Sequence, residues 1–421
     1  MVDRAFYSGT VLILGIIQLI ESIAISIPVS YFPNYAISLG ASVASIGLFT
    51  SSFMLMMAIL SPKVGSLSDA HGRKRFILLG LTGDVILGTL SGLAPSWHWL
   101  LLIRVFNGAA TAAAMLPAEA LLIDSVLPHR RGEASGFVMA LGMVGRNIGP
   151  VFGGTIQWLS VSNGLSLVNS YRIPYFVDSA LALLAVLLVA WRIKEPERRR
   201  QTRHSAVEGR ARAPLTPSIK VLLVTSFASG IGVGFIIPIS VLFYNDKFGI
   251  QPVEIGIIVS MTGLIGLTAS WLSGRISDKV GRKPMIVVGG LASRIFGFIL
   301  PFTVRVEQAA AILAGRSLGF NIMMPSMRAL RADIVPAESR GRFFGLFATA
   351  FTSGSIIGPM IGTYLYSVYR FKILKVGGFP IPGIGIPFFV NSIIGILTVI
   401  MLVLFVEEPK RILKPPTPRN P

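Results

Sequence analysis

Residues 65–75 read Gly65-Ser-Leu-Ser-Asp69-Ala-His-Gly72-Arg73-Lys74-Arg75, a basic stretch that is punctuated by glycine and lies between two long apolar runs. A second version, Gly274-Arg-Ile-Ser-Asp278-Lys-Val-Gly281-Arg282-Lys283, begins 209 residues later, with its glycines, aspartate and arginine at matched positions. An internal repeat of this kind fixes the architecture of a chain, so we predict two copies of a half of roughly two hundred residues.

The repeat continues well beyond this stretch. At the same offset of 209, Arg131-Gly132 matches Arg340-Gly341 and Gly149-Pro150 matches Gly358-Pro359. Towards the end of each half the offset becomes 213, and it then pairs Asp178 with Asn391 and Glu195-Pro196 with Glu408-Pro409. This slip of four residues predicts a longer loop before the last apolar run.

The composition indicates a membrane protein. Of the 421 residues, 52% are hydrophobic and only 14% are charged, with a mean hydropathy of +0.71. Apolar runs of about twenty residues are typical of membrane-spanning helices. We predict an all-α membrane protein of twelve transmembrane helices in two six-helix parallel repeats. The first helix is expected at 8–30, with a loop around Pro33-Asn34, and residues 63–75 and 275–283 are expected to be loops.

The same pattern predicts the domain bounds. An N-terminal six-helix bundle is expected at 1–191 and a C-terminal one at 218–406. Between them, residues 192–217 form a basic linker, and residues 407–421 form a tail. Both are expected on the cytoplasmic side. The first apolar run lacks a small-residue cleavage site and contains Glu21, so we interpret it as a helix rather than a cleavable signal.

The net charge of +19 does not indicate a nucleic-acid partner, because the basic residues lie in short segments between apolar runs. Their asymmetry follows the positive-inside rule and predicts that both termini are cytoplasmic. The opposite face is expected to carry only Arg172, Lys247, Arg305, Arg370, Lys372 and Lys375. The chain has no cysteine and four scattered histidines, so we expect no metal site.

The paired Gly-x-x-x-Asp-x-x-Gly-Arg-Lys motifs, in the context of a twelve-span repeat, resemble the signature of the major facilitator superfamily. The first copy departs from it at Ala70, where a basic residue is common in the family. The resemblance implies a cytoplasmic gate in which the motif arginine reaches an acid at the end of the fourth or tenth helix. The gate residues are then Gly65, Asp69, Gly72, Arg73, Asp124, Gly274, Asp278, Gly281, Arg282 and Asp333. The alternative is that these charges only set the topology.

The fifth span contains Gly145-Arg146-Asn147-Ile-Gly149-Pro150, which resembles a motif of the drug–proton antiporters in this superfamily. Proline removes a backbone hydrogen bond and bends a helix. We therefore expect helix bends at Gly149, Pro150, Gly358 and Pro359. Because the eleventh span repeats the Gly-Pro pair, a structural bend inherited from the duplication would explain the motif equally well.

Charged residues inside the spans are the candidate functional groups, since each costs roughly 2.5–3.5 kcal/mol at a helix centre. We select Glu21, Arg104, Glu119 and Arg146 for proton coupling and the substrate cavity. Glu21 is the hypothetical proton carrier, and a permanent ion pair between Glu21 and an arginine is the alternative. Asp84 and Arg294 are interpreted as structural, and Asp178 and Asn391 as helix caps near the interface.

These features together predict a transporter rather than an enzyme. We expect proton-coupled efflux, by antiport, of lipophilic or cationic small molecules through alternating access. The alternative is a proton symporter or facilitator that imports a sugar, an organic acid or another metabolite. The proton gradient supplies the energy and no cofactor is expected. The protein is expected to be a monomer in the plasma membrane, with protons, a small-molecule substrate and the lipid bilayer as its partners.

Overall fold

The computed structural model describes residues 9–193, 195, 215–336 and 339–407. Most of the expected linker 192–217 and of the expected tail 407–421 lies outside the described residues. The first half of the described chain contains α1 (Gly9–Ser26), α2 (Phe32–Ser38), α3 (Ile46–His71), α4 (Arg73–Gly92), α5 (Trp97–Asp124), α6 (Arg131–Ser162) and α7 (Leu167–Arg192). The second half contains α8 (Pro217–Phe248), α9 (Pro252–Val280), α10 (Arg282–Ile299), α11 (Val306–Ile334), α12 (Arg340–Tyr369), β1 (Ile373–Val376), β2 (Phe379–Pro382) and α13 (Ile386–Phe405).

Most of these helices are long and apolar enough to cross a membrane. In the described residues, 10 segments meet both conditions by length and composition. The other two long helices, α6 and α11, have 32 and 29 residues and do not meet the condition on composition. The structure thus confirms a helical chain with many candidate spans, while the prediction that twelve helices cross the membrane stays a prediction.

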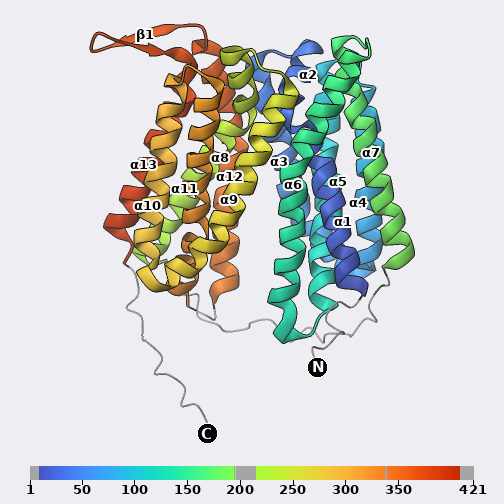
Figure 1. The fold of residues 1–421 in the computed structure, drawn as a ribbon. Coiled ribbons are helices and arrows are strands. Elements are labelled where there is room, and N and C mark those ends of the chain that lie inside the picture. The colour runs from blue at the N-terminus through green and yellow to red at the C-terminus, as the bar shows by residue number, and fades with distance from the viewer. Residues whose placement is uncertain (1–8, 194, 196–214, 337–338, 408–421) are drawn as a thin grey trace.

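The helices form two side-by-side bundles, one from α1–α7 and one from α8–α13 (Figure 1). Within the first bundle, α1 packs directly on the backbone of α6. A Cβ atom at Gly149 of α6 would lie 2.6 Å from the carbonyl oxygen of Ile23, closer than real Cβ atoms come. In the second bundle, α12 repeats this contact with α8, where Gly362 faces Phe235. Glycine therefore sets the distance between these helices, as is common in membrane bundles.

The two bundles contact each other near the end that carries the β1–β2 hairpin, which we call the hairpin end (Figure 1). There Thr363 of α12 donates a hydrogen bond to the carbonyl oxygen of Ala44 at 3.0 Å, and Pro359 packs on Gly47 of α3. A second contact between the bundles joins α9 to α6, where Gly256 packs on the backbone of Pro150. Both α6 and α12 remain helical through Pro150 and Pro359. The backbone of each proline contacts a glycine of the other bundle, so both prolines lie where the bundles meet.

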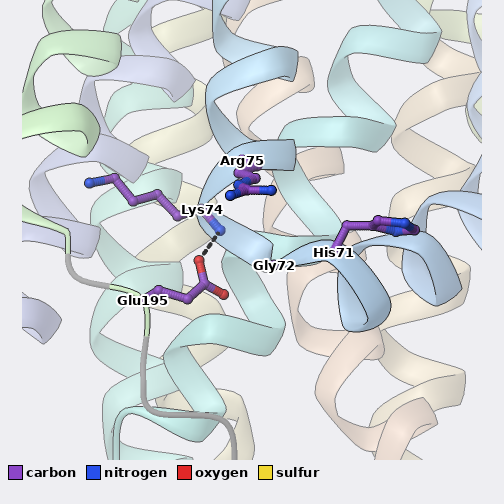
Figure 2. A pocket seen from close by; sticks show the side chains of 5 residues that line it. All are labelled: His71, Gly72, Lys74, Arg75 and Glu195. Atoms are coloured by element: carbon purple, nitrogen blue, oxygen red, sulfur yellow. Dashed lines mark hydrogen bonds between the residues drawn. The ribbon is translucent and has the colours of Figure 1, made fainter.

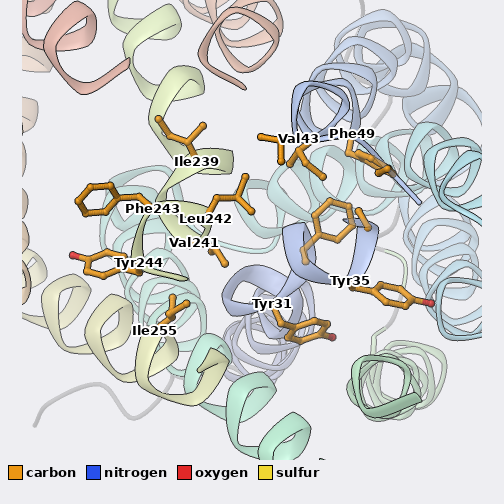
Figure 3. Close-up of a cluster of buried hydrophobic side chains, with 14 of the residues drawn as sticks. Tyr31, Tyr35, Val43, Phe49, Ile239, Val241, Leu242, Phe243, Tyr244 and Ile255 are labelled. Atoms are coloured by element: carbon orange, nitrogen blue, oxygen red, sulfur yellow. The ribbon is translucent and has the colours of Figure 1, made fainter. Parts of the chain in front are cut away.

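An apolar cluster fills the hairpin end between the bundles (Figure 3). It joins Tyr31, Tyr35 and Phe49 of the first bundle to Phe235 and Phe243 of α8. Tyr35 also donates a hydrogen bond to the carbonyl oxygen of Ser91 at 2.8 Å, so its hydroxyl is satisfied inside the cluster. Burial of large aromatic side chains from both halves stabilises the contact between them at this end.

Three local expectations were wrong. Residues 63–71 were expected in a loop but continue α3. The region around Pro33-Asn34 forms α2 instead of a loop, because Pro33 occupies the first turn of the helix, where its missing N–H is tolerated. Residues 275–280, also expected in a loop, continue α9. The longer loop expected before the last helix is confirmed, and it contains the β1–β2 hairpin, with Ile373 opposite Pro382.

The charges expected on the non-cytoplasmic face gather at the hairpin end. Arg172 donates to the carbonyl oxygen of Ala94, just after α4, at 3.1 Å. Lys247 contacts the carbonyl oxygen of Pro301. Arg370 pairs with Asp246 at 3.0 Å beside the hairpin. The opposite end of the bundle, which carries Gly72 and Gly281, is called the motif end below.

Replacing Gly149 with valine should lower the stability of the protein by about 1–3 kcal/mol, because the added methyl groups would press on the α1 backbone. Gly136→Val is the matched control on the same helix, since no heavy atom lies within 4 Å of a Cβ at that position. We expect the apparent melting temperature in detergent to fall for the first variant and to stay near the wild-type value for the second. Equal melting temperatures for the two variants would contradict the close packing of α1 on α6.

Candidate functional site

The repeated motif forms a sharp break between two helices. α3 ends at His71, α4 begins at Arg73, and Gly72 between them has φ +104°. Gly281 makes the same break between α9 and α10 with φ +108°. Only glycine adopts such a φ without strain. Gly65 and Gly274, in contrast, lie within α3 and α9, so neither takes part in the break.

Arg73 joins the ends of three helices at the motif end. Its guanidinium lies 3.2 Å from Asp69 Oδ1 on α3 and contacts Asp124 Oδ2 at the end of α5. In the second half, Arg282 lies 3.5 Å from Asp333. The side chain of Asp278 lies outside the described residues. The Asp69 side chain is 64% exposed and that of Asp124 is 40% exposed. Each such pair stabilises the fold by only about 0–1 kcal/mol, so these contacts can be remade as the helices move.

Glu195 adds a contact that sequence reasoning missed. Its carboxylate accepts a hydrogen bond from the backbone N–H of Arg73 at 2.7 Å. It accepts another from the backbone N–H of Lys74 at 2.8 Å (Figure 2). The Lys74 ammonium in turn donates to the carbonyl oxygen of Ala190 on α7 at 2.8 Å. A carboxylate at a helix N-terminus satisfies free N–H groups and interacts favourably with the helix dipole. The recurrence of Glu-Pro at 408 was the only sequence signal for this role.

Glu21 lies in the interior of the first bundle and retains only 9% of its accessible surface. Its Oε1 atom has no hydrogen-bond partner, and among the described residues Glu21 makes no ion pair. Its electrostatic neighbours are Asp84 of α4 and Asp178 of α7. Asp178 was expected to cap a helix near the interface, but it lies eleven positions into α7 and its side chain points into the bundle beside Gly88. The structure therefore brings three carboxyl groups together.

One cation accompanies these acids. The Arg104 guanidinium lies 4.3 Å from the centre of the Phe32 ring and within electrostatic range of Asp84 and Asp178. The side chain of Asn107, one turn further along α5, lies within hydrogen-bonding reach of Asp84. Arg104 is thus held by an aromatic face and by the acids as a group, rather than by one carboxylate.

Two other candidates lie apart from this group. Glu119 of α5 and Arg146 of α6 are both exposed. Neither takes part in an ion pair among the described residues, so the alternative of an ion pair between Glu21 and Arg146 is not found there. Sequence reasoning assigned Asp84 to a structural role and Asp178 to a helix cap. The structure instead makes them the two charged groups that act on the Glu21 carboxyl. The sequence signal that could have identified them is their position inside apolar runs, because acidic residues are rare in the interior of membrane-spanning helices.

Replacing Gly72 with alanine should destabilise the motif end, because an L-residue at φ +104° costs on the order of 1–3 kcal/mol. Gly65→Ala should be neutral or stabilising, since that position is helical and open around its Cβ. Hydrogen exchange of the 60–75 backbone amides would measure the difference. Faster exchange in Gly65→Ala than in Gly72→Ala would contradict this geometry.

Comparison with known proteins agrees with the fold and the motifs. The sequence profile of the Major Facilitator Superfamily matches residues 14–225 and 222–421. Multidrug resistance protein 2 of Bacillus subtilis is 25% identical over 373 residues, which cover 86% of this chain and 90% of that protein. The multi-drug resistance efflux pump PmrA of Streptococcus pneumoniae is 27% identical over 354 residues, covering 81% of this chain and 85% of that one.

Solved structures share the fold. A bacterial homologue of the human lysosomal transporter Spinster, in an inward-facing and occupied conformation, superposes with a TM-score of 0.79 at 17% identity. The match covers 96% of this chain and 97% of that chain. The nucleoside transporter NupG matches with a TM-score of 0.75 at 13% identity, covering 94% and 100% of the two chains. The two matched repeats and the shared fold together place the chain among transporters rather than enzymes, and it belongs to the Major Facilitator Superfamily.

Proposed function

We propose that the chain is a proton-coupled exporter of lipophilic or cationic small molecules. The observation that carries this proposal is the group formed by Glu21, Asp84 and Asp178 around Arg104, inside a bundle that lies in the lipid bilayer. Relatives that bear the names of multidrug resistance proteins and efflux pumps support the choice of substrate class.

The chemistry of this group suits exchange of a proton for a cation. Three carboxyl groups outnumber the single guanidinium of Arg104, and like charges repel strongly where water is scarce. A proton or a cationic ligand relieves that repulsion. The two compete for the same carboxyl oxygens, and the unpartnered Oε1 of Glu21 is the atom that we assign to the proton. Competition of this kind is what couples opposite movements of proton and substrate.

The proposed transport cycle moves the two bundles against each other. Contacts between them at the hairpin end, through Thr363, Pro359 and the aromatic cluster, close that side. The Arg73 contacts with Asp69 and Asp124 would rearrange at the motif end as access alternates. We further propose that all twelve long helices span the membrane and that residues 1–191 and 218–406 act as the two units. Both termini are proposed to be cytoplasmic, in a monomer in the plasma membrane.

The test is uptake of tetraphenylphosphonium into proteoliposomes with and without an imposed pH gradient. Wild-type protein should accumulate the cation only with the gradient. Glu21→Gln should lose gradient-driven accumulation, because the neutral amide cannot carry a proton. Asp84→Asn and Asp178→Asn should weaken it, because they reduce the negative charge that attracts the cation. Glu307→Gln, at an exposed position at the hairpin end, is the matched control and should transport like the wild type.

Two outcomes would change this proposal. If Glu21→Gln transports as well as the wild type, Glu21 does not carry the proton. If the folded wild-type protein moves no lipophilic cation in either direction, the export proposal fails, and import of a metabolite with protons becomes the function to test.

A further inference from the structure

The second bundle contains two arginines in its interior. Arg294 of α10 retains 7% of its accessible surface, and Arg316 of α11 is partly buried beside it. The two guanidinium groups are close enough to repel each other. A charge in the middle of a membrane bundle normally has a partner or faces a cavity.

Glycines on three helices provide the space for these side chains. A Cβ atom at Gly395 of α13 would lie 2.6 Å from Arg294 Cζ, so the guanidinium rests on the bare backbone of that helix. A Cβ at Gly232 of α8 would lie 2.6 Å from Asn391 Oδ1 and 3.9 Å from Arg294 Nη1. A Cβ at Gly297 of α10 would lie 3.6 Å from Arg316 Nε. The packing accommodates both arginines, rather than expelling them.

No carboxylate in the described chain balances these charges. Arg294 Nε and Asn391 Oδ1 are buried without a hydrogen-bond partner. Neither arginine takes part in an ion pair among the described residues. The acids of the described second half lie in the last or first turns of helices or just beyond them: Asp246, Glu254, Asp278, Glu307, Asp333 and Glu407. Two positive charges are therefore held inside this bundle with unused hydrogen-bonding capacity.

The internal repeat places this pair in the part of the second bundle that corresponds to the acidic group of the first bundle. Asn391 is the repeat partner of Asp178, and Gly297 is the repeat partner of Gly88. The two glycines have matching surroundings: a Cβ at Gly88 would lie 2.6 Å from Ser179 Oγ, and a Cβ at Gly297 would lie 3.1 Å from Ser392 Oγ. Corresponding interior regions thus hold three carboxyl groups in one bundle and two guanidinium groups in the other.

We propose that Arg294, Arg316 and Asn391 form an anion site, which receives the anionic group of an amphiphilic substrate. This inference rests on the proposed function as a carrier and refines its substrate class to molecules that combine an apolar body with a carboxylate, sulfonate or phosphate. Guanidinium groups suit these anions because each presents several N–H donors in a planar fork. Arg316 retains accessible surface and receives the anion first, while Arg294 lies deeper.

Binding of a matched pair of probes to the full chain in neutral detergent tests this site without a pH gradient. The probes are 5-dimethylaminonaphthalene-1-sulfonate and its uncharged sulfonamide, followed by fluorescence titration. Wild-type protein should bind the sulfonate at least about tenfold more tightly than the sulfonamide, as expected for charge-assisted hydrogen bonds. Arg294→Gln and Arg316→Gln should each weaken sulfonate binding by about tenfold or more and leave sulfonamide binding unchanged.

Two further variants control for folding and for general charge. Arg328→Gln removes an exposed arginine from the same helix as Arg316 and should bind both probes like the wild type. Arg316→Lys keeps the charge and should recover part of the preference for the sulfonate. Unchanged sulfonamide binding in each glutamine variant shows that the protein remains folded.

The outcomes separate the two proposals. Equal affinity for both probes in wild-type protein, or a preference that survives both glutamine substitutions, would overturn the anion site. Displacement of the sulfonate by chloride or inorganic phosphate at millimolar concentration, lost in the arginine variants, would support the site with a free anion as its occupant. Because this assay uses no proton gradient, a failure of proton-coupled export would leave its result intact, and loss of the anion site would leave tetraphenylphosphonium transport in place.

Discussion

Direct contact between helix backbones is the constraint on which the rest of the structure depends. α1 approaches α6 so closely at Gly149 that a Cβ atom at this position would overlap the α1 backbone. Gly362 of α12 allows the same close approach of α8. Similar contacts at Gly47 and Gly256 join the two bundles at the hairpin end. In a bilayer, lipid tails are as apolar as the side chains, so close packing, rather than removal of apolar surface from water, holds such helices together.

The same packing determines where charge can be placed. Each bundle contains ionisable side chains in its interior, but these side chains do not occupy the same repeat positions: Arg294 corresponds to Val85 and Arg316 to Asn107. The two halves share the glycines and serines around these sites. Gly88 lies beside Ser179 in the first half, and Gly297 lies beside Ser392 in the second. The charged residues diverged, from Asp178 in one half to Asn391 in the other. On our proposals, these two different sites give the carrier separate places for a proton or cation and for an anion.

The motif end has a different physical character, because its ion pairs are exposed and individually weak. Arg73 contacts acids on two helices, while Glu195 holds the first backbone N–H groups of α4. Glu195 follows α7, so the carboxylate links the start of one helix to the end of another that is more than a hundred residues away in sequence. Weak contacts shared among several helix ends are suited to an element that must open and close, since no single contact has to be broken at a large cost.

The sequence by itself determined the repeat, the membrane class and the ends at which basic residues gather. These follow from hydropathy, spacing and matched motifs, which are properties of the linear chain. The partners Asp124 and Asp333 of the motif arginines were implied by the resemblance to the major facilitator superfamily. The sequence could not reveal that residues 63–71 are helical, because glycine and serine in that stretch resemble a loop when the neighbouring helices are unknown. Only the tertiary structure decided which interior charges meet. The direction in which a side chain points depends on helix rotation and packing, so Asp84 and Asp178 joined Glu21, whereas Glu119 and Arg146 remained exposed.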